Sequence, residues 1–419
     1  RRRKLIDFVG LAVLVGLGLY SPHPKMLYYA LCGVGLYFVW RTWRFYIDER
    51  DVRSAAQRGG LFVLAMVLGL GLGAEGTFPL YKYTSSESKR AADVELSGRS
   101  ESDQLLFAQS WSLHPEEVVS LIVPEFGGFN RPNEGQSSYW GRNPGKDNSE
   151  YFGILVVFFA LILVPDVRRR PFIAFLCGGF LLALAYTLGG HTPVHWLAYH
   201  VLPGLNMFRA VGMAAFLFAF PACVLAALAL NAVVYGEDED RDRLHKRLRV
   251  VGTTLVAFAS LIAVSPAGFT DAWIGGLYSE IAPQKRLVLN ASLGWLSKGA
   301  LYTVITVAGA FVVLWLHRKG HIGVGLLVCL LGLLTVADTW RIGSEFLKYV
   351  DPKDYEDVRT SNTNARELMR KDGDLFRILP LPDYQILRQS GFSLEGIPSI
   401  TGFHDLTVGR YDHALQYVQ

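Results

Sequence analysis

The chain has 419 residues, of which 51% are hydrophobic and only 19% are charged, and its mean hydropathy is +0.26. Soluble domains carry roughly 25% charged residues, so this composition excludes a disordered chain and argues against an ordinary soluble enzyme. The net charge of +4 is small, and the basic residues come in short separate bursts. This pattern suits membrane topology better than a nucleic-acid surface, so we expect no nucleic-acid partner.

Nine apolar runs follow one another along the chain. A helix needs about 20 apolar residues to cross a bilayer, and the second and fourth runs, at about 15 residues, also fit re-entrant or interfacial segments. The sequence predicts an all-α polytopic membrane protein with about nine transmembrane helices. They lie at Leu5–Tyr20, Met26–Trp40, Gly60–Leu80, Phe152–Pro165, Phe172–Leu188, Ala210–Tyr235, Val250–Val264, Gly299–Leu316 and Ile322–Trp340.

Basic bursts recur at every second connection between the predicted spans. Because Lys and Arg near span ends stay on the cytoplasmic side, the bursts predict which connections are cytoplasmic. That side holds 19 basic residues, whereas the short connections of the other side hold five. The regular alternation favours nine spans and predicts that the large loops are extracytoplasmic.

Two large polar pieces fall on the predicted outer side and divide the chain. We expect transmembrane helices 1–3 in residues 1–80, an extracytoplasmic loop domain in 81–151, and helices 4–9 in 152–340. An extracytoplasmic C-terminal piece, 341–419, reads as the start of an α/β soluble domain. The chain begins at Arg1 without a methionine and stops within a helix-like pattern at Gln419, so we expect a fragment of a longer protein.

An acid pair opens a short predicted helix in the first outer piece. Pro115 suits the first helical position, and Glu116 and Glu117 suit its positive N-terminal end. A base or a metal ligand is the functional alternative for this pair. Helix-start chemistry is the favoured interpretation.

The connection between the fifth and sixth spans holds the densest group of polar candidates, namely His191, His195, His200 and Arg209. One interpretation is a phosphate pocket at the bilayer surface, in which the arginine clamps phosphate oxygens and a histidine donates a hydrogen bond. The second is an interfacial aromatic helix with polar tips among the headgroups. A metal site is the third, but no further ligand can be named.

Two carboxylates near the outer ends of spans are weak catalytic candidates. Asp338 is followed by Arg341, so the two can simply pair at i, i+3, or the carboxylate can face a cavity. Glu75 interrupts the end of the third span and is either interfacial or catalytic. The catalytic residue itself is therefore left unknown.

Cofactor motifs are missing from the sequence. The chain has no Walker loop, no GxGxxG and no GxSxG turn. Its four cysteines lie within apolar runs, without CxxC or Cys/His clusters, so we assign no metal site. No cofactor is identified, and a divalent metal is left open.

Several short passages follow one another along the outer side of the chain. They are Ser112-Leu-His-Pro-Glu-Glu, Val123-Pro-Glu-Phe-Gly-Gly, Tyr139-Trp-Gly, Glu150-Tyr-Phe-Gly, Leu202-Pro-Gly-Leu-Asn-Met-Phe-Arg-Ala, Asp338, Phe376-Arg-Ile-Leu-Pro, Ser399-Ile-Thr-Gly-Phe-His and Arg410-Tyr. Together they resemble the YfhO family of bacterial polytopic membrane proteins, in family order from about residue 60 to the end.

The resemblance implies a scaffold similar to GT-C glycosyltransferases, which use polyprenyl-phosphate-linked sugars, in the bacterial inner membrane. Similar proteins carry a catalytic acid in the first outer loop. Here the first outer connection, Ser21–Lys25, has no carboxylate, so the scaffold and Arg209 carry over but the base does not. The expected partners are a polyprenyl-phosphate-sugar lipid and membrane lipids.

Three functions are possible on this reading of the sequence. The first is transfer of a sugar from that lipid to an extracytoplasmic cell-envelope acceptor. The second is a non-catalytic scaffold or accessory subunit of a larger membrane complex, which the missing first-loop acid favours. The third is a transporter, which is weaker because charged residues within spans are scarce and no inverted repeat is visible.

Overall fold

The computed structural model is mostly helical. It describes residues 5–21, 23–86, 100–131, 136–143, 146–278 and 281–347, and the isolated positions 349, 351, 367–369, 371, 378 and 398. The chain divides into two compact units. One comprises Arg1–Gly73 with Ser100–Leu347, and the other comprises Ala74–Arg99 with Lys348–Gln419.

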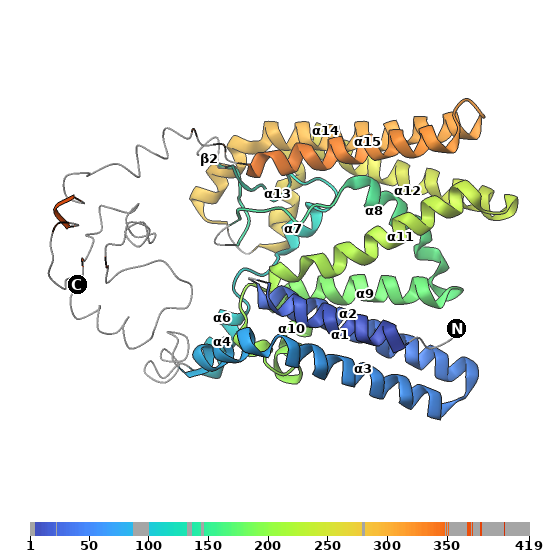
Figure 1. Cartoon of the computed structure of the whole chain (residues 1–419). Coiled ribbons are helices and arrows are strands. Elements are labelled where there is room, and N and C mark those ends of the chain that lie inside the picture. Colours follow the sequence, from blue (N-terminus) through green and yellow to red (C-terminus); the bar gives the residue numbers. More distant parts are fainter. Residues whose placement is uncertain are drawn as a thin grey trace. The chain divides into compact units, whose positions relative to one another are not determined.

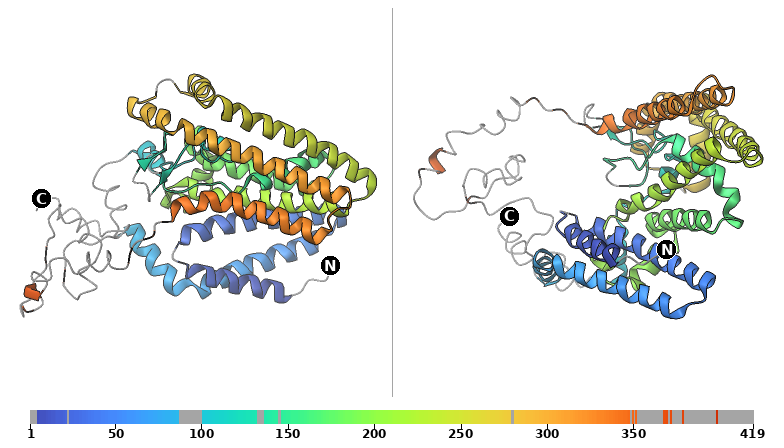
Figure 2. Two further views of the ribbon diagram at one scale, coloured as in Figure 1. Left: turned by 90° about the horizontal axis from the view of Figure 1, so that it is seen from above. Right: turned by 45° about the vertical axis from the view of Figure 1, so that its right-hand side comes forward.

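The first unit is a helical bundle in which each predicted span overlaps a helix. Successive long helices run in opposite directions along the bundle, as Figure 1 and the two views of Figure 2 show. The helices are α1 (Leu5–Leu19), α2 (Pro24–Glu49), α3 (Val52–Leu72), α8 (Ile154–Leu163), α9 (Pro171–Thr187), α11 (Phe216–Tyr235), α12 (Asp238–Val264), α14 (Pro283–Arg318) and α15 (Val324–Gly343).

Among the described residues, five helical segments are long and apolar enough to cross a membrane. They are Val52–Leu72, Val211–Tyr235, Arg241–Val264, Pro283–Arg318 and Val324–Phe346. Helices α1 and α9 are apolar but shorter. At most 39% of each spanning window is buried inside the bundle, as expected where lipid is the solvent. The structure therefore supports a membrane-embedded helical protein, and the count of nine spans remains a prediction.

The fourth predicted span, Phe152–Pro165, differs from the structure. Its helix α8 has ten residues and continues into the short 3₁₀ helix η1 (Val164–Arg168). Ten residues rise about 15 Å, half of a bilayer core. Seven of its ten residues are buried, including Phe158, Ile162 and Leu163, whereas Leu161 is 40% exposed. A helix that is apolar all round is a core helix, and α8 lies at the centre of the largest apolar cluster, which also draws on α9, α11, α12, α14 and α15.

The third predicted span, Gly60–Leu80, is also shifted. Helix α3 begins at Val52, because the Asp51 side chain accepts a hydrogen bond from the Ser54 backbone N–H at 2.9 Å. It ends at Gly73, where a Cβ would lie 2.5 Å from Leu19. A separate helix, α4 (Ala74–Ser86), follows and belongs to the second unit.

Helices α1 and α3 pack closely through small residues. A Cβ on Gly69 would lie 2.6 Å from the Cβ of Val15 and 2.8 Å from the carbonyl oxygen of Ala12. Glycine thus lets the two backbones approach, as is common between helices in membranes.

One end of the bundle carries the polar connections. The described residues of 100–153, which we call the cap, lie at this end together with α10 (Pro193–Val201) and α13 (Pro266–Leu277) (Figure 1). Within the cap are α6 (Glu101–Ala108), α7 (Pro115–Val119) and a small antiparallel pair, β1 (Asn130–Arg131) with β2 (Gln136–Ser137). The cap belongs to the same compact unit as the bundle, and the predicted extracytoplasmic loop domain over 81–151 stays a prediction.

The predicted C-terminal α/β piece lies almost wholly outside the described residues. Within it, Glu367–Met369 are helical, and the backbone N–H of Ile378 donates to the carbonyl oxygen of Pro398 at 3.0 Å.

Candidate functional site

Helix α7 positions the two acids of the cap. The backbone N–H of His114 donates to Glu117 Oε2 at 2.8 Å, and Pro115 occupies the first helical position. Helix-start chemistry therefore accounts for one oxygen of Glu117. Both acids are nevertheless buried, with Glu116 fully so. Their other oxygens need partners from elsewhere in the cap, because a buried charge without a partner is costly.

Arg142 is the partner of Glu116. Its Nη2 lies 3.0 Å from Glu116 Oε2, and its backbone N–H donates to Oε1 at 3.0 Å. The guanidinium also lies over the ring of Tyr278, 4.1 Å from the centroid. Burial alone would raise the pKa of Glu116, but the hydrogen bonds of Arg142 outweigh it and hold that pKa below its usual value.

A second buried group joins Glu117, Lys146, Glu150 and Tyr139. Lys146 Nζ lies 3.1 Å from Glu117 Oε1 and is also bonded to Glu150, while the Tyr139 hydroxyl donates to Glu117 Oε1 at 3.1 Å. Burial raises the pKa of Glu117 despite the opposing effect of Lys146. Burial alone would lower the pKa of Lys146, but the two carboxylates raise it. This group carries one more negative than positive charge.

Glu125, Arg341 and Asp338 form the third group. An ion pair joins Glu125 Oε1 to Arg341 Nη1, and Arg341 Nη2 lies 3.9 Å from Asp338 Oδ1. Burial raises the pKa of Glu125, although Arg341 opposes the rise. Glu125 Oε2 and Asp338 Oδ1 are buried, and neither has a hydrogen-bond partner among the described residues. These two carboxylate oxygens thus lie near Arg341 but accept no hydrogen bond from the described residues.

Gly299 of α14 makes room for Glu125. A Cβ at this position would lie 2.1 Å from the Glu125 carboxyl carbon. The carboxylate therefore lies directly on the backbone of α14, which only glycine permits.

The predicted weak candidate Asp338 has a structural role in the described contacts. Its Oδ2 accepts hydrogen bonds from the Tyr151 hydroxyl at 2.6 Å and from the backbone N–H of Ile154 at 3.0 Å. Ile154 is the first residue of α8, so Asp338 caps that helix from α15. The direct pair with Arg341 that the sequence offered as an alternative is long, at 3.9 Å.

The other weak candidate, Glu75, lies in the first turn of α4 and is exposed. It belongs to the second unit, whereas the other candidate site residues belong to the first.

The three histidines of the predicted phosphate pocket have different surroundings. His191 Nε2 lies 2.7 Å from His114 Nδ1, and burial lowers the pKa of His114 to about 4. His195 is 2% exposed, packs on the Tyr186 ring, and has a pKa lowered by burial to about 4. His200 is exposed, and its ring centroid lies 4.6 Å from that of Trp196, with the two ring planes tilted by 43°.

Arg209 is half-buried beside the cap. Its guanidinium lies 5.6 Å from the ring centroid of Phe107 in α6, and its carbonyl oxygen accepts a hydrogen bond from Lys25 at 3.0 Å. The described contacts thus connect Arg209 with the cap and with α2. They do not join it directly to the three histidines.

Sequence reasoning missed the arginines and lysine that pair with the cap acids. Arg142 and Lys146 lie in polar loop sequence, and nothing in their spacing links them to α7. The sequence does contain one sign of a buried charge. In the Glu125-Phe-Gly-Gly passage an acidic residue lies close to two glycines. Gly128 has φ +71°, and a Cβ there would lie 2.0 Å from the Ser138 carbonyl oxygen. These constraints mark a tightly packed loop and not a solvated one.

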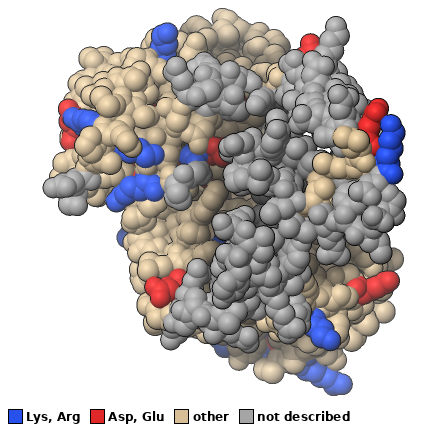
Figure 3. Space-filling model, turned by 90° about the vertical axis from the view of Figure 1, so that its left-hand side faces the viewer, with Lys and Arg blue, Asp and Glu red and all other residues tan. Residues whose placement is uncertain are grey.

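Metal binding has no support among the residues the structure describes, where no three His, Cys, Asp or Glu side chains gather suitably. On the end of the molecule seen in Figure 3, basic and acidic side chains lie scattered over a mostly uncharged described surface. The chain matches no protein family, no curated protein and no solved structure. The function of this chain must therefore be inferred from the geometry of its own side chains.

Proposed function

We propose that this protein is a membrane glycosyltransferase, acting on the outer face of a bacterial inner membrane. The donor is a sugar on a polyprenyl phosphate, and the acceptor belongs to the cell envelope. The observation that supports the proposal is that buried charged side chains from separate sequence passages meet within the cap and between the cap and α15. Glu117 meets Tyr139 and Lys146, and Glu125 meets Arg341.

Sugar transfer requires a cationic group near the leaving phosphate, because that phosphate gains negative charge as it departs. The oxygen of an acceptor hydroxyl forms a bond to the anomeric carbon, and the bond from that carbon to the phosphate oxygen breaks. The lipid phosphate leaves with the electron pair, and the hydroxyl proton is released to water. Arg209 offers a guanidinium for that phosphate, and the pair His114–His191 offers a neutral N–H donor. Apolar bundle surfaces suit the lipid tail. The proposal assigns no base.

The transfer proposal is tested at Arg209. Membranes containing the full chain are assayed for transfer of labelled sugar from a panel of polyprenyl-phosphate donors. Arg209→Ala is expected to reduce the rate of sugar transfer by about 100-fold or more. Arg209→Lys is expected to retain part of the transfer activity, because it keeps the positive charge. Arg44→Ala, which removes a partly exposed arginine paired with Asp48, is the control and is expected to leave transfer unchanged. Near-normal turnover of Arg209→Ala would refute the phosphate role.

A non-catalytic scaffold is the second candidate, because the cap charges largely satisfy one another. Glu116 is bound by Arg142, and Glu117 by Lys146. Such pairs fix a structure as readily as they serve a reaction. If the wild-type protein transfers no sugar from any donor but co-purifies stoichiometrically with another membrane protein, the scaffold is the better description.

A further inference from the structure

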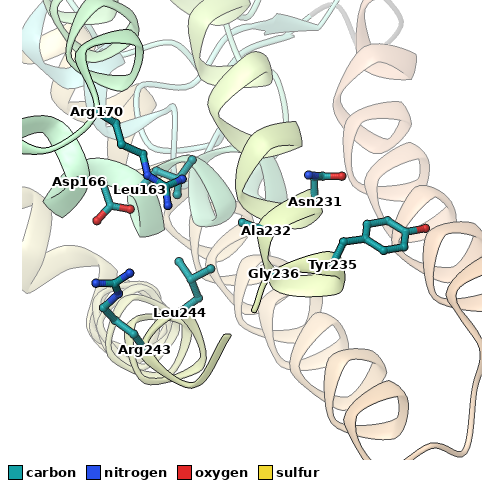
Figure 4. A pocket seen from close by; sticks show the side chains of 9 residues that line it. All are labelled: Leu163, Asp166, Arg170, Asn231, Ala232, Tyr235, Gly236, Arg243 and Leu244. Carbon is teal, nitrogen blue, oxygen red and sulfur yellow. The ribbon is translucent and has the colours of Figure 1, made fainter. Parts of the chain in front are cut away.

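The buried acids differ in how completely their oxygens are bonded. Among the described residues the buried acids are Glu116, Glu117, Glu125, Asp166 and Asp338. Asp166, which lines a cavity of about 210 Å³ (Figure 4), pairs with Arg247 at 2.9 Å. Two buried carboxylate oxygens have no hydrogen-bond partner in the described part of the chain, and they are Glu125 Oε2 and Asp338 Oδ1. These two acids lie in the same group.

Glu125 and Asp338 depend on one cation, Arg341. An ion pair joins Arg341 Nη1 to Glu125 Oε1, while Arg341 Nη2 lies 3.9 Å from Asp338 Oδ1 and donates no described hydrogen bond. Both acid side chains are 1% exposed. With both acids ionised, the group would carry one negative charge in excess where almost no water reaches it, which is costly.

The groups on the α8 and α14 sides of this site are uncharged. Asp338 Oδ2 accepts hydrogen bonds from the Tyr151 hydroxyl and from the Ile154 backbone N–H. The Tyr302 ring of α14 lies against Arg341, with its centroid 4.9 Å from the guanidinium carbon. These contacts orient the side chains but do not supply a second positive charge.

The nearest further charges on the neighbouring helices do not balance the excess. Lys298 precedes Gly299 on α14, but its side chain is exposed and has no described contact with either acid. The next charge after Arg341 along the chain is Glu345, which is itself acidic. Within the described residues, two buried acids therefore rely on one arginine.

One proton would remove both difficulties. Protonation of one carboxyl group cancels the excess charge and converts one unpartnered acceptor oxygen into an O–H donor. Burial raises the pKa of Glu125, and the nearby charge of Asp338 adds to the rise against the opposing effect of Arg341. A multivalent metal ion is a poorer fit, because no three His, Cys, Asp or Glu side chains gather in the described structure.

We propose that Glu125 and Asp338 hold one proton between them at neutral pH, and that this proton fastens the cap to α15. Glu125 lies in the cap, whereas Asp338 lies on α15 and also bonds the first residue of α8. The Arg341 side chain is 22% exposed, so the proton can exchange with water at this end of the bundle. Its release at higher pH leaves two anions beside one cation and weakens the contact. The inference does not depend on sugar transfer.

The first test is infrared spectroscopy of the detergent-purified full chain at about pH 7.5, where the C=O stretch of protonated carboxyl groups is recorded. Glu125→Gln and Asp338→Asn each provide a neutral partner, so the remaining acid ionises beside Arg341. Each variant should therefore lose the intensity of one protonated carboxyl group. The matched control is Glu116→Gln, which removes a buried acid that Arg142 keeps ionised and should leave the intensity unchanged.

The second test is the melting temperature between about pH 6 and about pH 9. The folded chain keeps a proton that unfolded Glu125 releases above its ordinary pKa of 4.5. This stabilisation is fully present below that value and is lost as the pH rises through the raised pKa of the folded state. The wild-type melting temperature should therefore fall by about 3 °C more than that of either single variant.

The double variant Glu125→Gln/Asp338→Asn provides a further check, because it leaves Arg341 without any carboxylate. It should melt about 5 °C or more below either single variant.

Several results would overturn the proposal. They are a wild-type protein without a protonated carboxyl band, full band intensity in either single variant, or the same pH slope in all three proteins. Stabilisation of the wild type by sodium chloride but not by choline chloride, without a protonated carboxyl band, would assign the site to a cation instead. The wild-type spectrum needs no variant, so it can contradict the proposal even if a variant does not fold.

Discussion

Asp338, near the end of α15, accepts a hydrogen bond at 3.0 Å from the backbone N–H of Ile154, the first residue of α8. The two residues are 184 positions apart in sequence. Since α8 is the buried centre of the bundle, this bond fixes where the core helix begins relative to a peripheral spanning helix. Tyr151 donates to the same oxygen at 2.6 Å and closes the arrangement.

Replacing Asp338 separates a structural role from a catalytic one. Asp338→Ala removes the acceptor of the Tyr151 hydroxyl and one of two acceptors of the Ile154 N–H, which also donates to the Tyr151 oxygen at 2.8 Å. We therefore expect a loss of about 1–3 kcal/mol in the free energy of unfolding. Asp338→Asn keeps an acceptor oxygen and should retain most of the stability. Thermal unfolding in detergent measures both, with the exposed Asp242→Ala as the control. A stable Asp338→Asn variant without transfer activity would instead indicate a role in catalysis.

Gly299→Ala tests the contact between α14 and Glu125. The added methyl group would overlap the Glu125 carboxylate, so we expect a destabilisation of about 1–3 kcal/mol. Gly294→Ala is the matched control in the same helix, because no atom lies within 4 Å of its added Cβ. The control should be neutral or stabilising by up to about 1 kcal/mol. Equal melting temperatures for the two variants would contradict the packing of Glu125 on α14.

The variant Arg142→Ala measures how much stability is lost when the buried carboxylate of Glu116 has no cationic partner. Glu116 is fully buried, so Arg142→Ala should lower the free energy of unfolding by about 3 kcal/mol at pH 7. The exposed pair Arg44–Asp48 supplies the control, Arg44→Ala, which should cost less than about 0.5 kcal/mol. The loss in Arg142→Ala should shrink as the pH falls, because a protonated Glu116 no longer needs a partner. A loss that does not depend on pH would argue against the charge pair as its cause.

His195 predicts a pH dependence of stability. Burial lowers its pKa from an ordinary value near 6.5 to about 4. Between these values the unfolded chain binds a proton at this position and the folded chain does not. Stability is therefore fully present above about pH 6.5 and falls as the pH decreases toward 4, by roughly 3 kcal/mol.

The variant His195→Phe should flatten that slope, since it keeps an aromatic ring against Tyr186 and cannot titrate. His200→Gln, on the exposed side of the same helix, serves as the control and should keep the wild-type slope. Melting temperatures measured from pH 7 to pH 4.5 decide the point. An unchanged slope in His195→Phe would show that other groups cause the acid sensitivity.

Apolar runs in the sequence locate the helices well. A helix that crosses lipid must form its backbone hydrogen bonds internally and must cover that backbone with apolar side chains. Each of the nine runs overlaps a helix, and the acids at the start of α7 were recognised from local rules. The predicted ends of the helices were less accurate than their positions. The Asp51 cap and the contact of Gly73 with Leu19 set the ends of α3, and the second of these is a tertiary contact.

Among the predicted site residues, sequence spacing grouped those that are close along the chain, such as His191, His195 and His200. The structure gives each of the three a different environment. Conversely, it brings Glu125 to Arg341 across 216 positions, which no local pattern indicates.

By itself, the sequence determined the helical membrane class and the positions of its apolar segments. Both follow from the burial of apolar side chains and from backbone hydrogen bonds that form within each segment separately. Tertiary structure alone decided which charges meet, that α8 is a core helix, and where a cavity lined by Asp166, Arg170 and Arg243 forms. Ion pairs and cavities depend on distances between segments, and those distances are fixed only when the helices have packed against one another.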